Sequence, residues 1–230
     1  MKTILIIGGN TGIGYETAKQ LTTEGHRVIA AVRNPESLQA LGIETQPFEA
    51  TNLNDLDLPD VLDGLVYFPG SINLKPFHRL SEDDFAQDYA INAQGAVHCL
   101  QKALPALKKS TSASIVFFST VAVQTGMPYH ASIAMAKGAI EGLTRSLAAE
   151  LAPKIRVNAI APSLTDTPLA SSLLSDDTRR EASAKRHPLN QVGNPADIAA
   201  LTSVLLGDQS KFITGQILSA DGGISSVKLF

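Results

Sequence analysis

A glycine-rich turn between an apolar run and an amphipathic segment is the feature that most restricts the fold of this chain. Residues Ile4–Ile7 form a short apolar run typical of a buried strand, and Ile13–Thr23 has the spacing of a helix, with Ala18 and Leu21 on one face. The turn between them reads Gly8-Gly9-Asn10-Thr11-Gly12-Ile13-Gly14. A strand, such a turn and a helix begin a βαβ unit whose helix N-terminus binds phosphate groups.

The glycines of this turn each meet a separate physical need. Gly8 permits a tight turn, Gly12 lets the backbone approach a pyrophosphate, and Gly14 lets the helix pack close to the strand. The first N–H groups of the helix and its positive dipole end then face the phosphates. We therefore predict a dinucleotide site at this turn, formed by Gly8, Asn10, Thr11, Gly12, Ile13 and Gly14.

The rest of the chain alternates apolar runs with longer amphipathic segments. Near-continuous apolar strands between helices are typical of a parallel sheet covered on both faces, so the expected fold class is α/β, doubly wound. The absence of a Pro-, Gly- or Ser-rich linker indicates one domain over residues 1–230. The expected strands are Arg27–Val32, Thr45–Phe48, Leu62–Phe68, Ser114–Ser119, Ile155–Ile160 and Gln216–Ser219, and the expected helices are Asp84–Leu107 (one or two in succession), Ile133–Leu151 and Ala196–Leu206.

The segment between Phe48 and Leu62 interrupts this alternation. Its Asn, Asp and Pro residues disfavour a regular helix, although a crossover between parallel strands needs about a dozen residues. We expect a turn-like crossover or a single helical turn there.

Composition excludes several classes of function. The formal net charge is −3 and there is no run of Lys or Arg, so no nucleic-acid partner is expected. No apolar stretch approaches a membrane span, the apolar run at the N-terminus is too short for a signal peptide, and no metal site is predicted. The single cysteine, Cys99, is expected to be a buried structural thiol. These observations favour a cytoplasmic protein.

The end of the second expected strand predicts which dinucleotide binds. An acidic residue there would accept hydrogen bonds from the adenosine ribose of NAD. This chain has Val32 followed by Arg33, and a guanidinium can pair with the 2′-phosphate of NADP. The predicted cofactor is therefore NADP(H) rather than NAD(H).

Further motifs are spread along the chain. They are Glu49-Ala50-Thr51 after the third expected strand, Asn92 in Ile91–Gly95, Lys137 in Ala136–Thr144, the stretch Arg156–Thr167, and Thr214-Gly215-Gln216 with Asp221-Gly222-Gly223. With the spacing Gly8-x-x-x-Gly12-x-Gly14, they make the chain resemble the short-chain dehydrogenase/reductase family over nearly all of its 230 residues.

This resemblance implies a Rossmann-type seven-stranded sheet and a homodimer or homotetramer built on the two long helices. It implies hydride transfer between NAD(P)H and a carbonyl or alcohol carbon, or an activated alkene, of a small-molecule substrate. The cofactor contacts that it implies beyond the glycine turn are Glu49, Ala50, Thr51, Gly70, Asn92, Lys137, Pro162, Ser163, Thr165 and Thr167. The segment Leu164–His187 is expected to be the lid over the substrate.

This chain departs from the family pattern at the residue expected to donate the proton. The family uses a tyrosine as proton donor, a lysine one turn later, a serine that orients the substrate and a helix asparagine that holds a water. Lys137 and Asn92 match, and Thr120 keeps a hydroxyl at the serine position, but Ile133 stands where the tyrosine is expected. Isoleucine can neither donate nor accept a proton.

Two nearby side chains are candidates to replace that tyrosine. Tyr129 and His130 precede Lys137 by eight and seven residues, and Met127-Pro128 indicates that the chain turns into the helix there. A Tyr-(x)6-Lys spacing occurs in the enoyl-acyl-carrier reductase branch of the family, and here it reaches His130. The sequence favours an NADP(H)-dependent oxidoreductase with a non-standard proton donor. The alternatives are a catalytically silent NADP(H)-binding sensor or scaffold, and a subunit whose partner carries the tyrosine.

Overall fold

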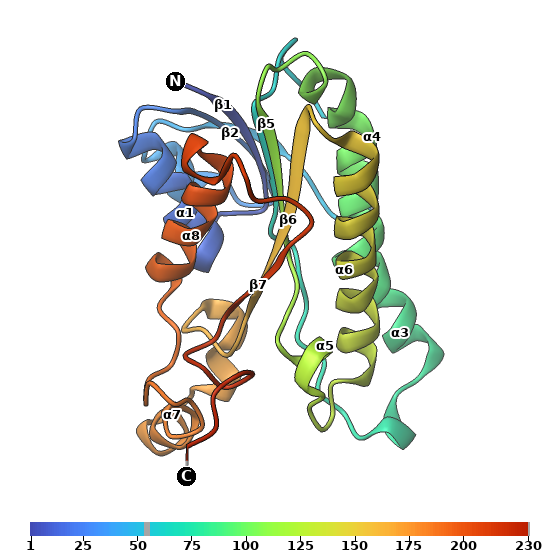
Figure 1. The fold of residues 1–230 in the computed structure, drawn as a ribbon. Coiled ribbons are helices and arrows are strands. Elements are labelled where there is room, and N and C mark those ends of the chain that lie inside the picture. Colours follow the sequence, from blue (N-terminus) through green and yellow to red (C-terminus); the bar gives the residue numbers. More distant parts are fainter. Residues whose placement is uncertain (53–55, 230) are drawn as a thin grey trace.

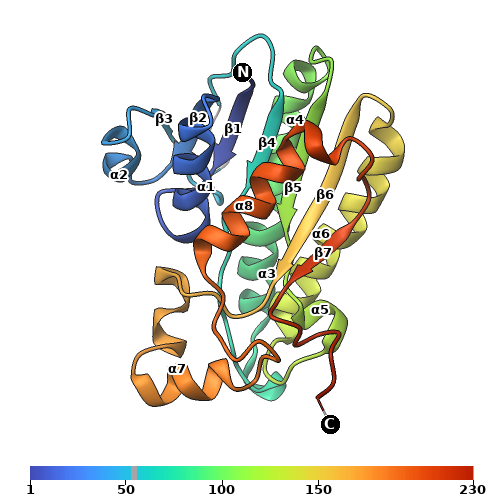
Figure 2. The ribbon, with the colours of Figure 1, turned by 60° about the vertical axis from the view of Figure 1, so that its left-hand side comes forward.

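Seven parallel strands form one sheet in the computed structural model, which describes residues 1–52 and 56–229. Their order is β3-β2-β1-β4-β5-β6-β7, as Figure 2 shows. The doubly wound, seven-stranded parallel sheet expected from the sequence is therefore confirmed. The strands are β1 (Thr3–Ile7), β2 (Arg27–Val32), β3 (Glu44–Pro47), β4 (Gly64–Tyr67), β5 (Ala113–Phe118), β6 (Ile155–Pro162) and β7 (Ile217–Ala220).

Helices cover both faces of this sheet (Figure 1). On one face lie α1 (Gly12–Thr23) and α8 (Pro195–Leu206), and on the other lie α3 (Glu82–Tyr89), α4 (Gly95–Leu107) and α6 (Ala131–Leu151). Alternate residues of β1 enter the two hydrophobic cores: Ile4 and Ile6 pack on the α1 side, and Leu5 and Ile7 on the α4 side. The near-continuous apolar character of the strands follows from this double burial.

The long helical segment expected at 84–107 consists of two helices joined by a wider turn. The π-helical turn η2 (Ala90–Gln94) lies between α3 and α4, and Asn92 is buried within it. Tyr67 donates a hydrogen bond from its hydroxyl to the carbonyl oxygen of Ile91, at 2.6 Å. A side chain at Gly95 would collide with that hydroxyl. Strand β4 therefore fixes the position of the turn that carries Asn92.

Several short elements were not expected from the sequence. These are α2 (Glu36–Gln39), α5 (Ala122–Thr125), α7 (Asp177–Ala184) and the 3-10 turns η1 (Phe77–Arg79), η3 (Pro168–Leu173) and η4 (Asp208–Ser210). The crossover expected between Phe48 and Leu62 includes residues 53–55, which lie outside the described residues. Helices long and apolar enough to cross a bilayer are absent from the described part of the chain.

The topology indicates where a ligand would bind, at the carboxyl ends of the central strands. The chain leaves β1 toward β2 on one side, whereas β4 lies on its other side, so the strand order reverses between β1 and β4. Ligands of open α/β sheets bind outside the carboxyl ends of the strands at such a reversal. In Figure 2 this edge faces α7, opposite the N-terminus.

Candidate active site

A cavity of about 660 Å³ opens at the carboxyl ends of the strands. Its size is within the range of small-molecule and cofactor sites. Its walls come from segments that directly follow β1, β2, β3, β4, β5 and β6, together with α6 and the segment 164–187. Residues named from the sequence that line it are Gly8, Asn10, Thr11, Gly12, Ile13, Gly14, Arg33, Glu49, Ala50, Gly70, Thr120, His130, Lys137, Pro162, Ser163, Thr165 and Thr167.

The glycine turn has the geometry that the sequence predicts. A side chain at Gly14 would collide with the backbone of Gly9, so the start of α1 can lie against the turn only because position 14 has none. Gly12 has a φ of +57°, and a Cβ there would lie 3.0 Å from Thr167. The side chain of Thr11 makes no capping hydrogen bond to α1. The first N–H groups of α1 therefore remain available to an anion, and this cradle fits a pyrophosphate.

Arg33 lies at one end of the cavity, directly after β2. Its guanidinium is 3.8 Å from a carboxylate oxygen of Glu49, and the arginine side chain is 73% exposed. An exposed pair at this distance contributes little to stability, so the guanidinium is free to exchange this partner for another anion. Val32 is buried and offers no polar atom here.

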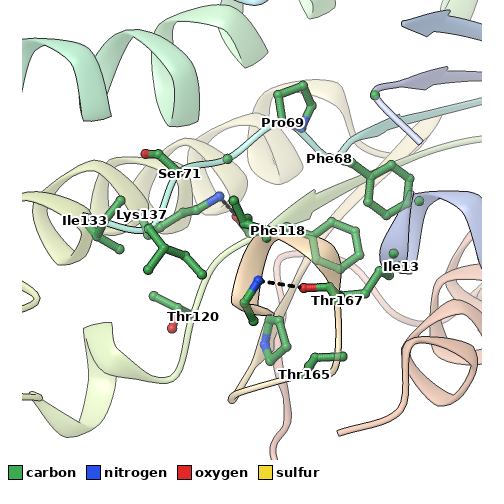
Figure 3. A pocket seen from close by; sticks show the side chains of 18 of the residues that line it. Ile13, Phe68, Pro69, Ser71, Phe118, Thr120, Ile133, Lys137, Thr165 and Thr167 are labelled. Atoms are coloured by element: carbon green, nitrogen blue, oxygen red, sulfur yellow. Dashed lines mark hydrogen bonds between the residues drawn. The ribbon is translucent and has the colours of Figure 1, made fainter. Parts of the chain in front are cut away.

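Lys137 lies at the other end of the cavity, on the inward face of α6. Its side chain is buried, and its Nζ donates a hydrogen bond to the carbonyl oxygen of Phe118, at 2.9 Å. Desolvation lowers the pKa of Lys137 from 10.5 to about 8. Ile133, one helical turn earlier, is also buried and lines the cavity. Figure 3 shows Ser71, Thr120, Ile133 and Lys137 at this end, away from Ile13 and Phe68.

Asn92 does not line the cavity but lies directly behind Gly70. Its Nδ2 donates to the hydroxyl of Ser71 and to the backbone carbonyl of Asp88, both at 2.8 Å. Its Oδ1 is buried and has no hydrogen-bond partner within the described ranges. A Cβ built on Gly70 would lie 3.2 Å from this oxygen and 3.6 Å from Lys137 Nζ. The missing side chain of Gly70 thus leaves a polar niche, which fits a hydroxyl group of a bound molecule.

Tyr129 and His130 differ in their relation to the cavity. Tyr129 is 58% exposed, has a φ of +69°, and is not among the lining residues. His130 is half-buried, lines the cavity, and directly precedes α6. Its Nδ1 lies 2.7 Å from the carbonyl oxygen of Pro128. Because a carbonyl only accepts, Nδ1 carries a hydrogen and Nε2 is the nitrogen free to exchange a proton.

The segment 164–187 closes one side of the cavity with apolar residues and a histidine. Leu164, Leu169 and Leu173 line the cavity, and so does His187. His187 is buried, with Nε2 2.9 Å from the hydroxyl of Ser163 and Nδ1 2.9 Å from the carbonyl of Ser183. By the same donor logic, Ser163 donates to His187, and its remaining lone pair is available to a ligand.

Some residues of the site were not found from the sequence, and three predicted residues, Thr51, Asn92 and Tyr129, lie outside the cavity lining. Ser71, Ile72 and Ile224 line it without belonging to any motif. Thr51 is exposed and does not line it. In the described part of the chain, no group of three or more His, Cys, Asp or Glu residues is arranged to hold a metal ion.

Known proteins resemble this chain over most of its length. A family model described as short chain dehydrogenase matches residues 2–58, and one described as enoyl-(acyl carrier protein) reductase matches residues 56–225. A tropinone reductase homologue from Arabidopsis thaliana is 33% identical over 97% of this chain and 92% of its own. The 3-oxoacyl-acyl-carrier-protein reductase FabG of Thermotoga maritima is 31% identical over 97% of both chains.

Solved structures give the same result. A short-chain dehydrogenase/reductase from Brucella melitensis superposes with a TM-score of 0.88 and 30% identity, covering 98% of this chain and 97% of that one. The structure of ElxO with NADP bound superposes with a TM-score of 0.87 and 27% identity, covering 99% and 100%. The chain therefore belongs to the short-chain dehydrogenase/reductase family of oxidoreductases.

Proposed function

We propose that this protein is an NADP(H)-dependent oxidoreductase that uses a proton donor other than a tyrosine at position 133. The observation that carries this proposal is the juxtaposition of Lys137 and Ile133 at one end of a cavity whose other end holds Arg33. A bound reduced nicotinamide would supply a hydride to a carbonyl carbon or an activated alkene. The remaining tasks belong to the chain: binding the cofactor, orienting the substrate and moving one proton.

Arg33 supports the preference for NADP(H). Its guanidinium already lies near one anion, Glu49, and is exposed enough to turn toward a phosphate. The NADP-bound relative ElxO shows that a protein of this fold binds that cofactor. A charge-assisted pair of this type is typically worth about 1.5–3 kcal/mol, or roughly ten- to a hundredfold in affinity.

Titration of NADPH and NADH by cofactor fluorescence tests this preference. We expect NADPH to bind more tightly, and Arg33→Ala to remove most of the difference. Glu49→Gln should strengthen NADPH binding, because it removes the competing carboxylate. Arg27→Ala is the matched control, since Arg27 starts the same strand but pairs with Glu44 outside the cavity. Equal affinities in the native protein would overturn the assignment.

His130 is the proton donor that the geometry favours over Tyr129. It lines the cavity, whereas Tyr129 does not, and in its imidazolium form, with both ring nitrogens protonated, its Nε2 can give a proton to a developing oxyanion. Thr120 offers a hydroxyl to orient the substrate oxygen, and Lys137 offers an ammonium group at the same end. General acid help contributes about 10²–10⁴-fold to the rate, so simple ketones should need His130 more than quinones or conjugated alkenes.

Turnover of NADPH with ketones, quinones and enoyl thioesters tests the chemistry. We expect His130→Ala to lower kcat for ketones by about 10²-fold or more, and Tyr129→Phe to change it little. His78→Ala is the control, because His78 is exposed and outside the cavity lining. Full activity of His130→Ala would rule this donor out. Activity only in an Ile133→Tyr variant would instead indicate a cofactor-binding protein without its own chemistry, or a subunit that needs an active partner.

Two further features complete the proposal. We assign the segment 164–187 as the substrate lid, because its leucines face the cavity and Thr167 packs against the glycine turn. The apolar lining favours a substrate with an apolar body.

We also assign the protein to the cytoplasm, since its single cysteine is buried and unpaired.

A further inference from the structure

A buried carboxylate is joined by hydrogen bonds to the wall of the cavity. The hydroxyl of Ser71 donates to Oδ1 of Asp88 at 2.6 Å, and the same hydroxyl oxygen accepts from Nδ2 of Asn92 at 2.8 Å. Asp88 is only 3% exposed, on the inward side of α3, and Ser71 lines the cavity. Burying a carboxylate costs free energy unless it is hydrogen-bonded. The buried position of Asp88 therefore suggests that its hydrogen bonds have a role at the cavity wall.

The direction of these hydrogen bonds follows from the chemistry of Asp88. Oδ1 of Asp88 accepts from Ser71, which gives it the single hydrogen of its hydroxyl. The oxygen of Ser71 can then only accept, and it requires the NH₂ end of Asn92. The two ends of an amide have nearly the same shape, and the hydrogen-bond network decides between them. Asp88 therefore determines, through Ser71, which end of Asn92 faces inward.

The consequence of that orientation lies at Gly70. With its NH₂ held by Ser71 and by the Asp88 backbone, Asn92 presents a bare Oδ1 beside Gly70, close to Lys137 Nζ. This oxygen is buried and unpartnered in the part of the chain that the structure describes. Reversing the amide would present a donor beside the ammonium donor of Lys137, and the niche would then lack an acceptor.

We propose that Asp88 and Ser71 are positioning residues that hold the Asn92 amide with its oxygen toward Lys137, so that the niche at Gly70 both accepts from and donates to a hydroxyl group. The ligand chemistry is that of a sugar hydroxyl, which gives one hydrogen to Asn92 and accepts one from Lys137. This inference rests on the proposed function for the identity of that ligand as part of NADP(H). The orientation itself depends on this chain's residues alone.

A first experiment reads the orientation without cofactor. The side-chain NH₂ resonances of Asn92, assigned by their loss in Asn92→Ala, should exchange slowly with solvent in the perdeuterated, ¹⁵N-labelled protein. Ser71→Ala and Asp88→Leu should each raise that exchange rate by at least tenfold. Asp88→Asn should preserve slow exchange, because its Oδ1 still accepts from Ser71. Asp83→Leu, on the exposed side of the same helix, should leave it unchanged. Unchanged exchange in both Ser71→Ala and Asp88→Leu would overturn the proposal.

A second experiment is a double-mutant cycle on NADPH affinity. Asp88→Leu and Ser71→Ala should each weaken binding by about tenfold in the native background, the effect of one well-placed hydrogen bond. Neither should weaken it further when Asn92→Ala is already present, because both act through that side chain. Additive losses would show a general structural role and would contradict the proposal.

The two experiments separate the possible failures. If Asp88→Leu does not fold, the double-mutant cycle is measured with Ser71→Ala and Asn92→Ala alone, since Ser71→Ala removes only a hydroxyl. If the native protein binds neither NADPH nor NADH, the proposed function fails, while the exchange experiment still decides whether Asp88 orients Asn92.

Discussion

Lys137 is the residue whose chemistry depends most on its surroundings. In the folded protein its pKa is about 8, because burial disfavours the ammonium form, whereas the group titrates near 10.5 when exposed. Between these values the unfolded chain holds a proton that the folded chain has released. The free energy of unfolding therefore rises with pH across this window, and below about pH 8 the folded state bears the full cost of the buried charge.

Lys137→Met should reveal this cost directly. At pH 7 the variant should be more stable than the native protein, by at most about 3 kcal/mol. The difference should shrink as the pH rises from about 8 to 10.5, because the native lysine loses its charge. Urea unfolding at a series of pH values measures it, with the exposed Lys19→Met as control for removing an ammonium group. A difference that stays constant with pH would contradict the buried-charge explanation.

Gly14 gives a second prediction at the same scale. A methyl group there meets the backbone of Gly9, so Gly14→Ala must displace the glycine turn. We expect a loss of about 1–3 kcal/mol in stability, and NADPH binding weakened by more than tenfold. Gly142→Ala is the matched control, because Gly142 lies in a helix with open space around it, and it should gain about 0.5–1 kcal/mol. Equal effects of the two variants on binding would exclude the packing role of Gly14.

Among the elements, the η2 turn depends on two particular neighbours, Tyr67 and Gly95. Its carbonyl at Ile91 is satisfied by the Tyr67 hydroxyl, which in turn needs the bare backbone of Gly95. Tyr67→Phe removes this hydrogen bond and should cost about 1 kcal/mol. It should also weaken NADPH binding, because η2 carries Asn92. Tyr15→Phe, on α1 at the opposite face of the sheet and outside the cavity lining, is the control and should change neither quantity.

A double variant tests the coupling between β4 and this turn. Gly95→Ala alone should be strongly destabilising, since its methyl group meets the Tyr67 hydroxyl. With Tyr67→Phe also present, part of that loss should be recovered, as measured by urea unfolding. If the two losses simply add, the hydroxyl and Gly95 are not in conflict and the account of the turn is wrong.

The elements also show why sequence reasoning succeeded in some places and not in others. The strands were predicted to within two residues at either end, because a buried parallel strand has an unbroken apolar sequence such as Ile4–Ile7. The short helices α2, α5 and α7 were missed, since four to eight mostly polar residues carry little periodicity. The glycine turn was predicted because its spacing is local. Ser71 and Asp88 were not, because they lie 17 residues apart, one in the loop after β4 and the other on α3, and no motif predicts that they meet.

At the scale of the whole molecule, the outer face of α3 and α6 is the predicted contact between subunits. Met135 on α6 and Tyr89 on α3 are about half exposed, at 51% and 45%, and Figure 1 shows no element covering α6 on that side. We expect a homodimer or homotetramer, since an apolar helix face in water favours association.

Light scattering measures this state. Met135→Glu should shift the protein toward a 24.3 kDa monomer, because it places a charge in the contact. Val204→Glu, on the opposite face at α8, is the control and should leave the oligomer intact. A native protein that is monomeric at micromolar concentration would contradict the prediction.

The cavity draws its walls from almost the whole length of the chain, from Gly8 to Ile224. A molecule that fills it therefore acts as a reversible cross-link between segments that otherwise meet only through the sheet. By mass action, NADPH at a hundred times its dissociation constant should add about 2.7 kcal/mol to the free energy of unfolding. For a chain of this size that corresponds to roughly 5–10 °C in Tm. Because several segments form the site together, the added stability should reach both the glycine turn and the segment 164–187. The backbone amides of these two segments should therefore exchange their hydrogens with solvent more slowly, and by a similar factor, when NADPH is bound.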